Sequence, residues 1–254
     1  MEKAPERPVI DEIIADLGVY QNPKILLDEY KEIIAVVKVN QDDLKKYSSL
    51  LFTVSRAWRK TLKYHHYFQE FYPPEDKVNK VEVLNHHIHA YLEDMTILKN
   101  KIEVLLGEMK NDIKKVAPDK KGVDAFFRAG VEKTGEVFAG ITKHRNPHHH
   151  SGTQFYDGDL LKAENARTTR EMLDNPMIDS MLNQEHKPEL IAKTQKDEQE
   201  SFDVAMKHWI DTAAKNDEQT SGYLNAVLEA VKGNLYLFLN IKPVKEIIET
   251  AKNH

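Results

Sequence analysis

The sequence predicts an all-α protein, and three observations lead to that class. Glycine and proline number only 10 each among 254 residues, which is too few for a fold that turns often between strands. Apolar residues recur every three or four positions through most of the chain, as one face of a helix requires. Hydrophobic residues make up 41% of the chain, enough for a real core. We therefore expect a helical bundle with a long antiparallel helical hairpin, plus a smaller C-terminal helical region.

The clearest periodic signal predicts one helix over Val81–Val116. Its apolar residues are spaced three and four apart almost without interruption, close to a heptad pattern. This seam consists of Val81, Leu84, Ile88, Tyr91, Met95, Leu98, Ile102, Leu105, Met109, Ile113 and Val116. A turn at Pro118–Gly122 follows, and we expect the next helix, Val123–His144, to run back antiparallel to the first.

The remaining helices are predicted from shorter apolar patterns and from their end signals. Before the long helix we expect Val9–Leu17, Pro23–Val39, and a helix that Asp42 caps and that runs to Phe71. After it we expect a helix from an N-cap at Asp159 to Leu173, then Pro176–Leu182, Ser201–Ala214, Tyr223–Leu239 and Pro243–Lys252. Trp58 and Trp209 are predicted to pack in the core, and the aromatic run between Tyr64 and Tyr72 is predicted to pack in the core and at a helix end.

The polar stretch Asn183–Glu200 predicts a linker and therefore two domains. Residues 1–182 would form the bundle, and residues 183–254 a C-terminal helical hairpin that packs on the bundle or on a partner.

Composition and the absence of known motifs exclude several classes. Cysteine is absent, so disulfides and thiolate metal sites are excluded, and a cytoplasmic location is expected. The first residues lack the apolar core of a secretion signal, so none is expected, and no apolar run has the length that a membrane span needs. The net charge of −5 argues against a protein that coats nucleic acid with its whole surface. Neither a phosphate-binding glycine loop nor a nucleophile elbow is present.

The densest group of functional side chains is the string KHRNPHHHSG at positions 143–152. Arg145, Asn146 and His150 form the pattern R-N-x-x-x-H. A histidine can exchange a proton near neutral pH, and a guanidinium can bind a phosphate through two hydrogen bonds. Such a set suits proton transfer and charge stabilisation at a phosphate group. This chemistry needs no cofactor.

The motif lies at the end of a helix that follows a long antiparallel helix. Together, the motif and this order of helices resemble the HEPN family over the stretch from Asp42 to Asp174. The resemblance implies a metal-independent ribonuclease or a nucleotide-binding protein, a homodimer, and a role in a toxin or antiviral defence system. It implies that His150 is the acid or base, Arg145 the phosphate clamp and Asn146 the polar helper. Pro147 stands inside the motif, and the motif geometry is kept only if this proline opens a turn of helix.

Further residues are candidates for binding the substrate. His144 and His148 flank the motif, and His148 is also an alternative to His150 in proton transfer. Arg56 and Arg59 lie on a basic helix face that could contact phosphates, or that could simply be solvated above a buried Trp58.

Two other interpretations stay open. His86, His89 and Glu93, with Glu82 one turn earlier, share one helical stripe that could hold a metal ion. Alternatively, the chain is a non-enzymatic helical scaffold or interaction protein in which the motif is vestigial.

Overall fold

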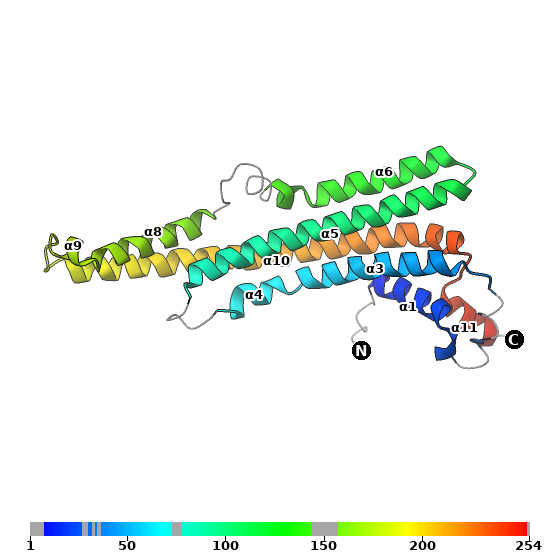
Figure 1. Cartoon of the computed structure of the whole chain (residues 1–254), viewed down its shortest axis with the longest axis horizontal. Helices are drawn as coiled ribbons and strands as arrows, with labels where there is room; N and C mark the ends of the chain where they lie inside the picture. The colour runs from blue at the N-terminus through cyan, green and yellow to red at the C-terminus, as the bar shows by residue number, and fades with distance from the viewer. Residues whose placement is uncertain are drawn as a thin grey trace, which may run out of the picture. The chain divides into compact units, whose positions relative to one another are not determined.

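The structure, a computed structural model, describes residues 8–26, 30–31, 34, 37–72, 78–143 and 157–252. Every regular element in these residues is a helix, which confirms the all-α prediction (Figure 1). The chain divides into two compact units. Unit 1 comprises Met1–Arg59, Met95–Ala139 and Glu218–His254, and unit 2 comprises Lys60–Asp94 and Gly140–Asp217.

Three long helices supply segments to both units. They are α3 (Gln41–Thr61), α5 (Lys80–Val116) and α10 (Lys187–Leu239). Unit 1 adds α1 (Val9–Gln21), the 3₁₀ helix η1 (Pro23–Ile25), α6 (Lys120–Val137) and α11 (Val244–Lys252). Unit 2 adds α4 (Tyr64–Glu70), α8 (Gly158–Leu173) and α9 (Pro176–Asp179).

Helix α5 confirms the strongest prediction. Every residue of its predicted apolar seam is buried except Val116, which ends the helix and is 69% exposed. Burying such a row removes a continuous strip of apolar surface from water, which is the main favourable term in folding.

In unit 1, α5 and α6 form the predicted hairpin (Figure 1). Asp119 caps α6 by accepting a hydrogen bond from the amide of Gly122, and Lys114 of α5 forms an ion pair with Asp124 of α6. The hydroxyl of Tyr223, on α10, donates to the carbonyl of Gly130 at 3.0 Å. Three helices of unit 1 are thus joined by polar contacts at the edge of their apolar core.

The predicted helix from Asp42 to Phe71 is wrong in two respects. It is broken by a turn at Leu62 and Lys63 into α3 and α4, and its cap is Asn40, whose Oδ1 accepts the amide of Asp42 at 3.0 Å. Asparagine is as good an N-cap as aspartate, so the sequence signal did not discriminate between them. The break lets α4 bury Tyr64 and Phe68, which are 3% and 0% exposed.

The predicted linker at Asn183–Glu200 and the predicted C-terminal hairpin are also wrong. Helix α10 is one helix of 53 residues that includes most of the predicted linker. Polar residues such as Glu, Lys and Gln have high helix propensity, and the chain has no glycine or proline between Pro188 and Gly222. The boundary of the compact units within α10 is Asp217, so the division into 1–182 and 183–254 does not describe them.

Three of the shorter predicted helices are present with shifted ends. Helix α1 continues to Gln21, α8 begins at Gly158, and α9 ends at Asp179. The predicted helix Pro23–Val39 begins as the 3₁₀ helix η1, and much of its remainder lies outside the described residues. None of the described helices is both long enough and apolar enough to cross a membrane.

Candidate functional site

The predicted catalytic residues Arg145, Asn146 and His150 lie outside the described residues, as do His144 and His148. The described chain reaches Lys143 in helical conformation and resumes at Asp157. Both of these flanking residues belong to unit 2.

Asp157 is the first described residue after the motif, and it caps the helix that follows, α8. Its Oδ1 caps α8 by accepting the amides of Asp159 at 2.9 Å and Leu160 at 3.2 Å. Its Oδ2 accepts the indole N–H of Trp209, on α10, at 3.1 Å. The predicted cap, Asp159, is therefore wrong by two residues, while Trp209 is buried as predicted. One carboxylate both starts α8 and ties it to α10.

The two predicted arginines of the basic face lie in unit 1 and have different surroundings. Arg59 forms an ion pair with Asp11 at 2.6 Å, and its guanidinium lies 5.9 Å from the centre of the Trp58 ring. Arg56 is exposed. Trp58 is buried and its indole N–H donates to Ser221 at 3.0 Å. These contacts favour the interpretation of a solvated basic face above a buried tryptophan.

The candidate metal stripe is not assembled into a site. His86 is exposed, whereas His89 and Glu93 are half-buried. Within the part of the chain that the structure describes, no three histidine or acidic side chains converge so that they could hold a metal ion. Glu82 lies 3.6 Å from the guanidinium of Arg167 on α8.

The structure reveals a buried carboxyl group in unit 2, that of Asp217, which sequence reasoning missed. The side chain of Asp217, on α10, is 14% exposed, and its Oδ1 is buried with no hydrogen-bond partner among the described residues. Its Oδ2 lies 4.0 Å from Nδ1 of His65, on α4. Burial raises the pKa of Asp217 to about 7. This carboxyl group can therefore gain and lose a proton near neutral pH, the property that general acids and bases need.

Two other polar side chains of unit 2, Asp94 and Asn216, do have hydrogen-bond partners. Asp94 accepts hydrogen bonds from Lys60 at 2.7 Å and from the hydroxyl of Tyr64. Asn216, the neighbour of Asp217, donates its side-chain amide to the hydroxyl of Tyr91 at 3.0 Å. No sequence signal distinguishes Asp217 from the many other charged residues of α10, because its burial depends on the packing of α4 and α5.

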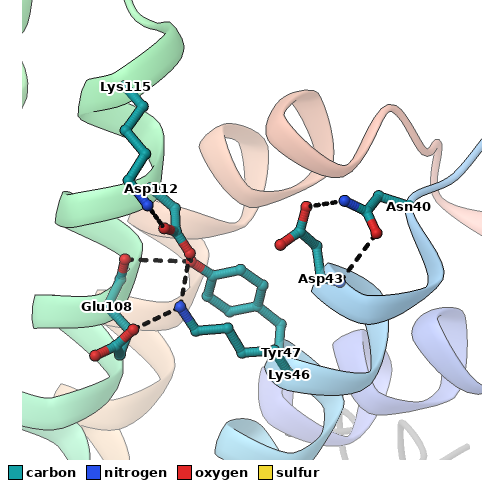
Figure 2. A network of polar contacts seen from close by, with 7 residues as sticks. All are labelled: Asn40, Asp43, Lys46, Tyr47, Glu108, Asp112 and Lys115. Atoms are coloured by element: carbon teal, nitrogen blue, oxygen red, sulfur yellow. Dashed lines mark hydrogen bonds and ion pairs between the residues drawn. The ribbon is translucent and has the colours of Figure 1, made fainter.

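Unit 1 contains the opposite arrangement, a carboxylate saturated with donors (Figure 2). Asp112, on α5, accepts hydrogen bonds from the hydroxyl of Tyr47 at 2.9 Å and from Lys46 and Lys115 at 2.7 Å each. Burial alone would raise the pKa of Asp112, but the hydrogen bonds from Lys115, Lys46 and Tyr47 outweigh it and lower the pKa to about 2. Such a group stays ionised at all ordinary pH values and is suited to structure rather than to proton transfer.

No protein-family model matches the chain, and neither a curated protein nor a solved structure is significantly similar to it. The function must therefore be argued from the chain's own residues.

Proposed function

We propose that the chain is a metal-independent ribonuclease of the HEPN-like type, with its active site at Arg145, Asn146 and His150. The observation that carries this proposal is the R-N-x-x-x-H string between two helical segments of an all-α chain. On each side of the string, the first described residue belongs to unit 2, and the later side is tied to α10 through Asp157.

The chemistry assigns one step to each side chain. A neutral imidazole takes the proton of a ribose 2′-hydroxyl, and the freed oxygen attacks the adjacent phosphorus atom. The bond from phosphorus to the 5′-oxygen breaks, and that oxygen takes a proton from an imidazolium. Arg145 donates to the phosphate oxygens, where negative charge builds up, and Asn146 orients the turn or donates to the same group.

One imidazole cannot begin a turnover both neutral and protonated, so the reaction needs a second proton carrier. We infer that a homodimer supplies it, with His150 of each copy facing the same phosphate, and that the protein acts on RNA in the cytoplasm. A role in toxin action or antiviral defence would suit an enzyme that destroys RNA with no cofactor.

The proposal is tested by incubating purified protein with single-stranded RNA. We expect cleavage by the wild-type protein in the presence of EDTA, and a loss of at least about a hundred-fold in Arg145→Ala and in His150→Ala, because each change removes a group from the transition state. His86→Ala, an exposed histidine of α5, is the matched control and should cleave normally. Cleavage that survives both motif substitutions would refute the proposal. Protein that neither cuts nor binds RNA would support the scaffold interpretation instead.

A further inference from the structure

One end of unit 1, where α5 turns into α6, carries positive charge in a chain that is negative as a whole. Between Lys110 and Arg128 the sequence has six lysine and arginine residues but three aspartates, a net charge of +3. The whole chain has a net charge of −5, which leaves −8 for the remaining residues. We call residues 110–128 the basic end. Its cations are Lys110, Lys114, Lys115, Lys120, Lys121 and Arg128.

The three aspartates of the basic end are engaged in contacts within the protein. Asp112 is buried among the donors described above, and Asp119 caps α6. Asp124 forms an ion pair with Lys114, and the hydrogen bond of that pair, together with the nearby charge of Arg128, lowers the pKa of Asp124. The charge that the basic end offers to a partner is therefore mainly positive.

The lysines nearest the turn between α5 and α6 face solvent. The side chain of Lys115 is 72% exposed. Lys120 and Lys121, the first two residues of α6, are exposed, and neither forms an ion pair with any other described residue. Ammonium groups on flexible, solvated stems contribute little to folding. These cations are therefore accessible to an anionic partner.

Exposed apolar side chains lie at the same end of unit 1, where the turn between α5 and α6 and the end of α10 come together (Figure 1). Val116, the last residue of α5, is 69% exposed, and Phe126 of α6 is 43% exposed. Phe126 borders a groove of about 280 Å³ that Asn234 of α10 also lines. Leu237, one turn beyond Asn234, is 82% exposed. Lysines and exposed apolar side chains thus occur together.

This combination discriminates between anionic partners. The phosphates of a nucleic acid would attract the lysines but offer little to aliphatic groups such as Val116 and Leu237. Protein interfaces favour arginine and are poor in lysine, whereas five of the six cations here are lysines. A membrane with anionic lipids has a negative surface potential and, just beneath the headgroups, a layer that accepts apolar side chains. The same potential repels the negative remainder of the chain, so only this end is attracted.

We propose that the basic end binds the surface of a membrane that contains anionic lipids. The lysines would lie at the headgroups, and Val116, Phe126 and Leu237 in the interfacial layer. The inference goes beyond the proposed function and does not depend on it, since attachment would place the chain at a membrane whatever reaction it catalyses. Because ion pairing at an exposed surface supplies much of the affinity, binding should be reversible and sensitive to salt.

Co-sedimentation of the full chain with vesicles tests the proposal. We expect binding to phosphatidylcholine vesicles that contain about 30% phosphatidylserine, and binding at least about ten-fold weaker to pure phosphatidylcholine or in about 0.5 M salt. Replacing Lys120→Glu together with Lys121→Glu should weaken binding about thirty-fold or more. Acidic residues suit the first turn of a helix, so this variant should fold, and thermal unfolding checks that it does.

A second variant tests the apolar side chains, and a third is the matched control. Val116→Ser combined with Leu237→Ser should weaken binding on the order of ten-fold, because both side chains leave water in the bound state. Lys193→Glu combined with Lys196→Glu makes the same change of charge at exposed residues of α10 in unit 2 and should leave binding within about two-fold of the wild-type protein.

Three outcomes would overturn the membrane contact. The first is no binding to vesicles with phosphatidylserine at low salt, and the second is equal binding by the wild-type protein and the Lys120→Glu, Lys121→Glu variant. The third is a variant that loses affinity for single-stranded RNA but not for vesicles, which would assign these lysines to nucleic acid instead. None of these outcomes decides whether the chain cleaves RNA, which His150→Ala tests separately.

Discussion

Two buried carboxylates, Asp112 in unit 1 and Asp217 in unit 2, have pKa values shifted in opposite directions. Asp112 has donors on both oxygens and a pKa lowered to about 2. Asp217 has one buried oxygen with no partner among the described residues and a pKa raised to about 7. Both side chains are mostly buried, at 9% and 14% exposed. They differ in the number of hydrogen-bond donors, and Asp217 is also surrounded by more protein than Asp112, which adds to the rise in its pKa.

The comparison also separates the units by role. In unit 1 the network of Asp112 joins α3 to α5 and leaves no proton to exchange near pH 7 (Figure 2). Unit 2 holds the titratable Asp217 and the residues that flank the proposed active site. We expect changes to the Asp112 network of unit 1 to alter stability and changes in unit 2 to alter pH dependence and RNA chemistry.

The largest effect on stability is expected from Asp112→Ala. The change leaves the ammonium groups of Lys46 and Lys115 and the hydroxyl of Tyr47 without their shared acceptor. We expect the free energy of unfolding at pH 7 to fall by about 3 kcal/mol. Urea denaturation measures it, with Glu136→Ala as control, since that residue forms only an exposed ion pair with Lys133. A loss below about 1 kcal/mol would show that the network does not stabilise unit 1.

Asp217→Asn is expected to have a smaller effect of the opposite sign. The folded chain binds the Asp217 proton more tightly than the unfolded chain does, since the pKa rises from 3.8 to about 7. This group therefore favours folding below pH 3.8, and its contribution is lost as the pH rises toward 7. Replacing it by asparagine should flatten that part of the stability curve and stabilise the protein by about 2 kcal/mol above pH 7.

Denaturation measured at several pH values between 3.5 and 8 tests the expected effect of Asp217→Asn. Asp211→Asn, a 64% exposed site on the same helix, should keep the pH dependence of the wild-type protein. Identical pH profiles for Asp217→Asn and the wild-type protein would mean that Asp217 finds a donor or solvent in solution, and the contrast with Asp112 would be lost.

The smallest effect is expected from Tyr47→Phe. The change removes one of three donors to Asp112 and keeps the ring, which packs edge to face against Phe238 at 5.9 Å. The free energy of unfolding should fall by about 1 kcal/mol. In a double-mutant cycle with Asp112→Ala the two losses should not add, because both remove the same hydrogen bond. Additive losses would show that the tyrosine acts elsewhere.

The spacing of apolar residues was sufficient to predict the elements that depend mainly on local sequence. The seam of α5 follows from its spacing, and the α5–α6 hairpin follows from the turn at Pro118–Gly122. The break between α3 and α4 could not be predicted, because it depends on where Tyr64 and Phe68 find buried partners. The polar composition of residues 183–200 suggested a linker, yet the same residues are good helix formers once their apolar neighbours pack.

The candidate sites likewise differ in whether the sequence alone can reveal them. The motif of Arg145 and His150 can be recognised in the sequence, since its residues are close together along the chain. Asp217 and His65 are 152 positions apart by subtraction of their numbers, and only tertiary packing makes them neighbours. The contact between His87 and the carbonyl oxygen of Phe71 likewise joins residues from different elements, and composition does not reveal it.

The most direct test of the proposed ribonuclease is the chemical analysis of its product ends. Single-stranded RNA is incubated in EDTA with the wild-type protein, with His150→Ala and with Asp112→Asn, and the termini are identified by mass spectrometry. Attack by a 2′-hydroxyl predicts 2′,3′-cyclic phosphate and 5′-hydroxyl ends from the wild-type protein and from Asp112→Asn, and no product from His150→Ala. Ends carrying 3′-hydroxyl and 5′-phosphate groups, or equal product from His150→Ala, would contradict the account.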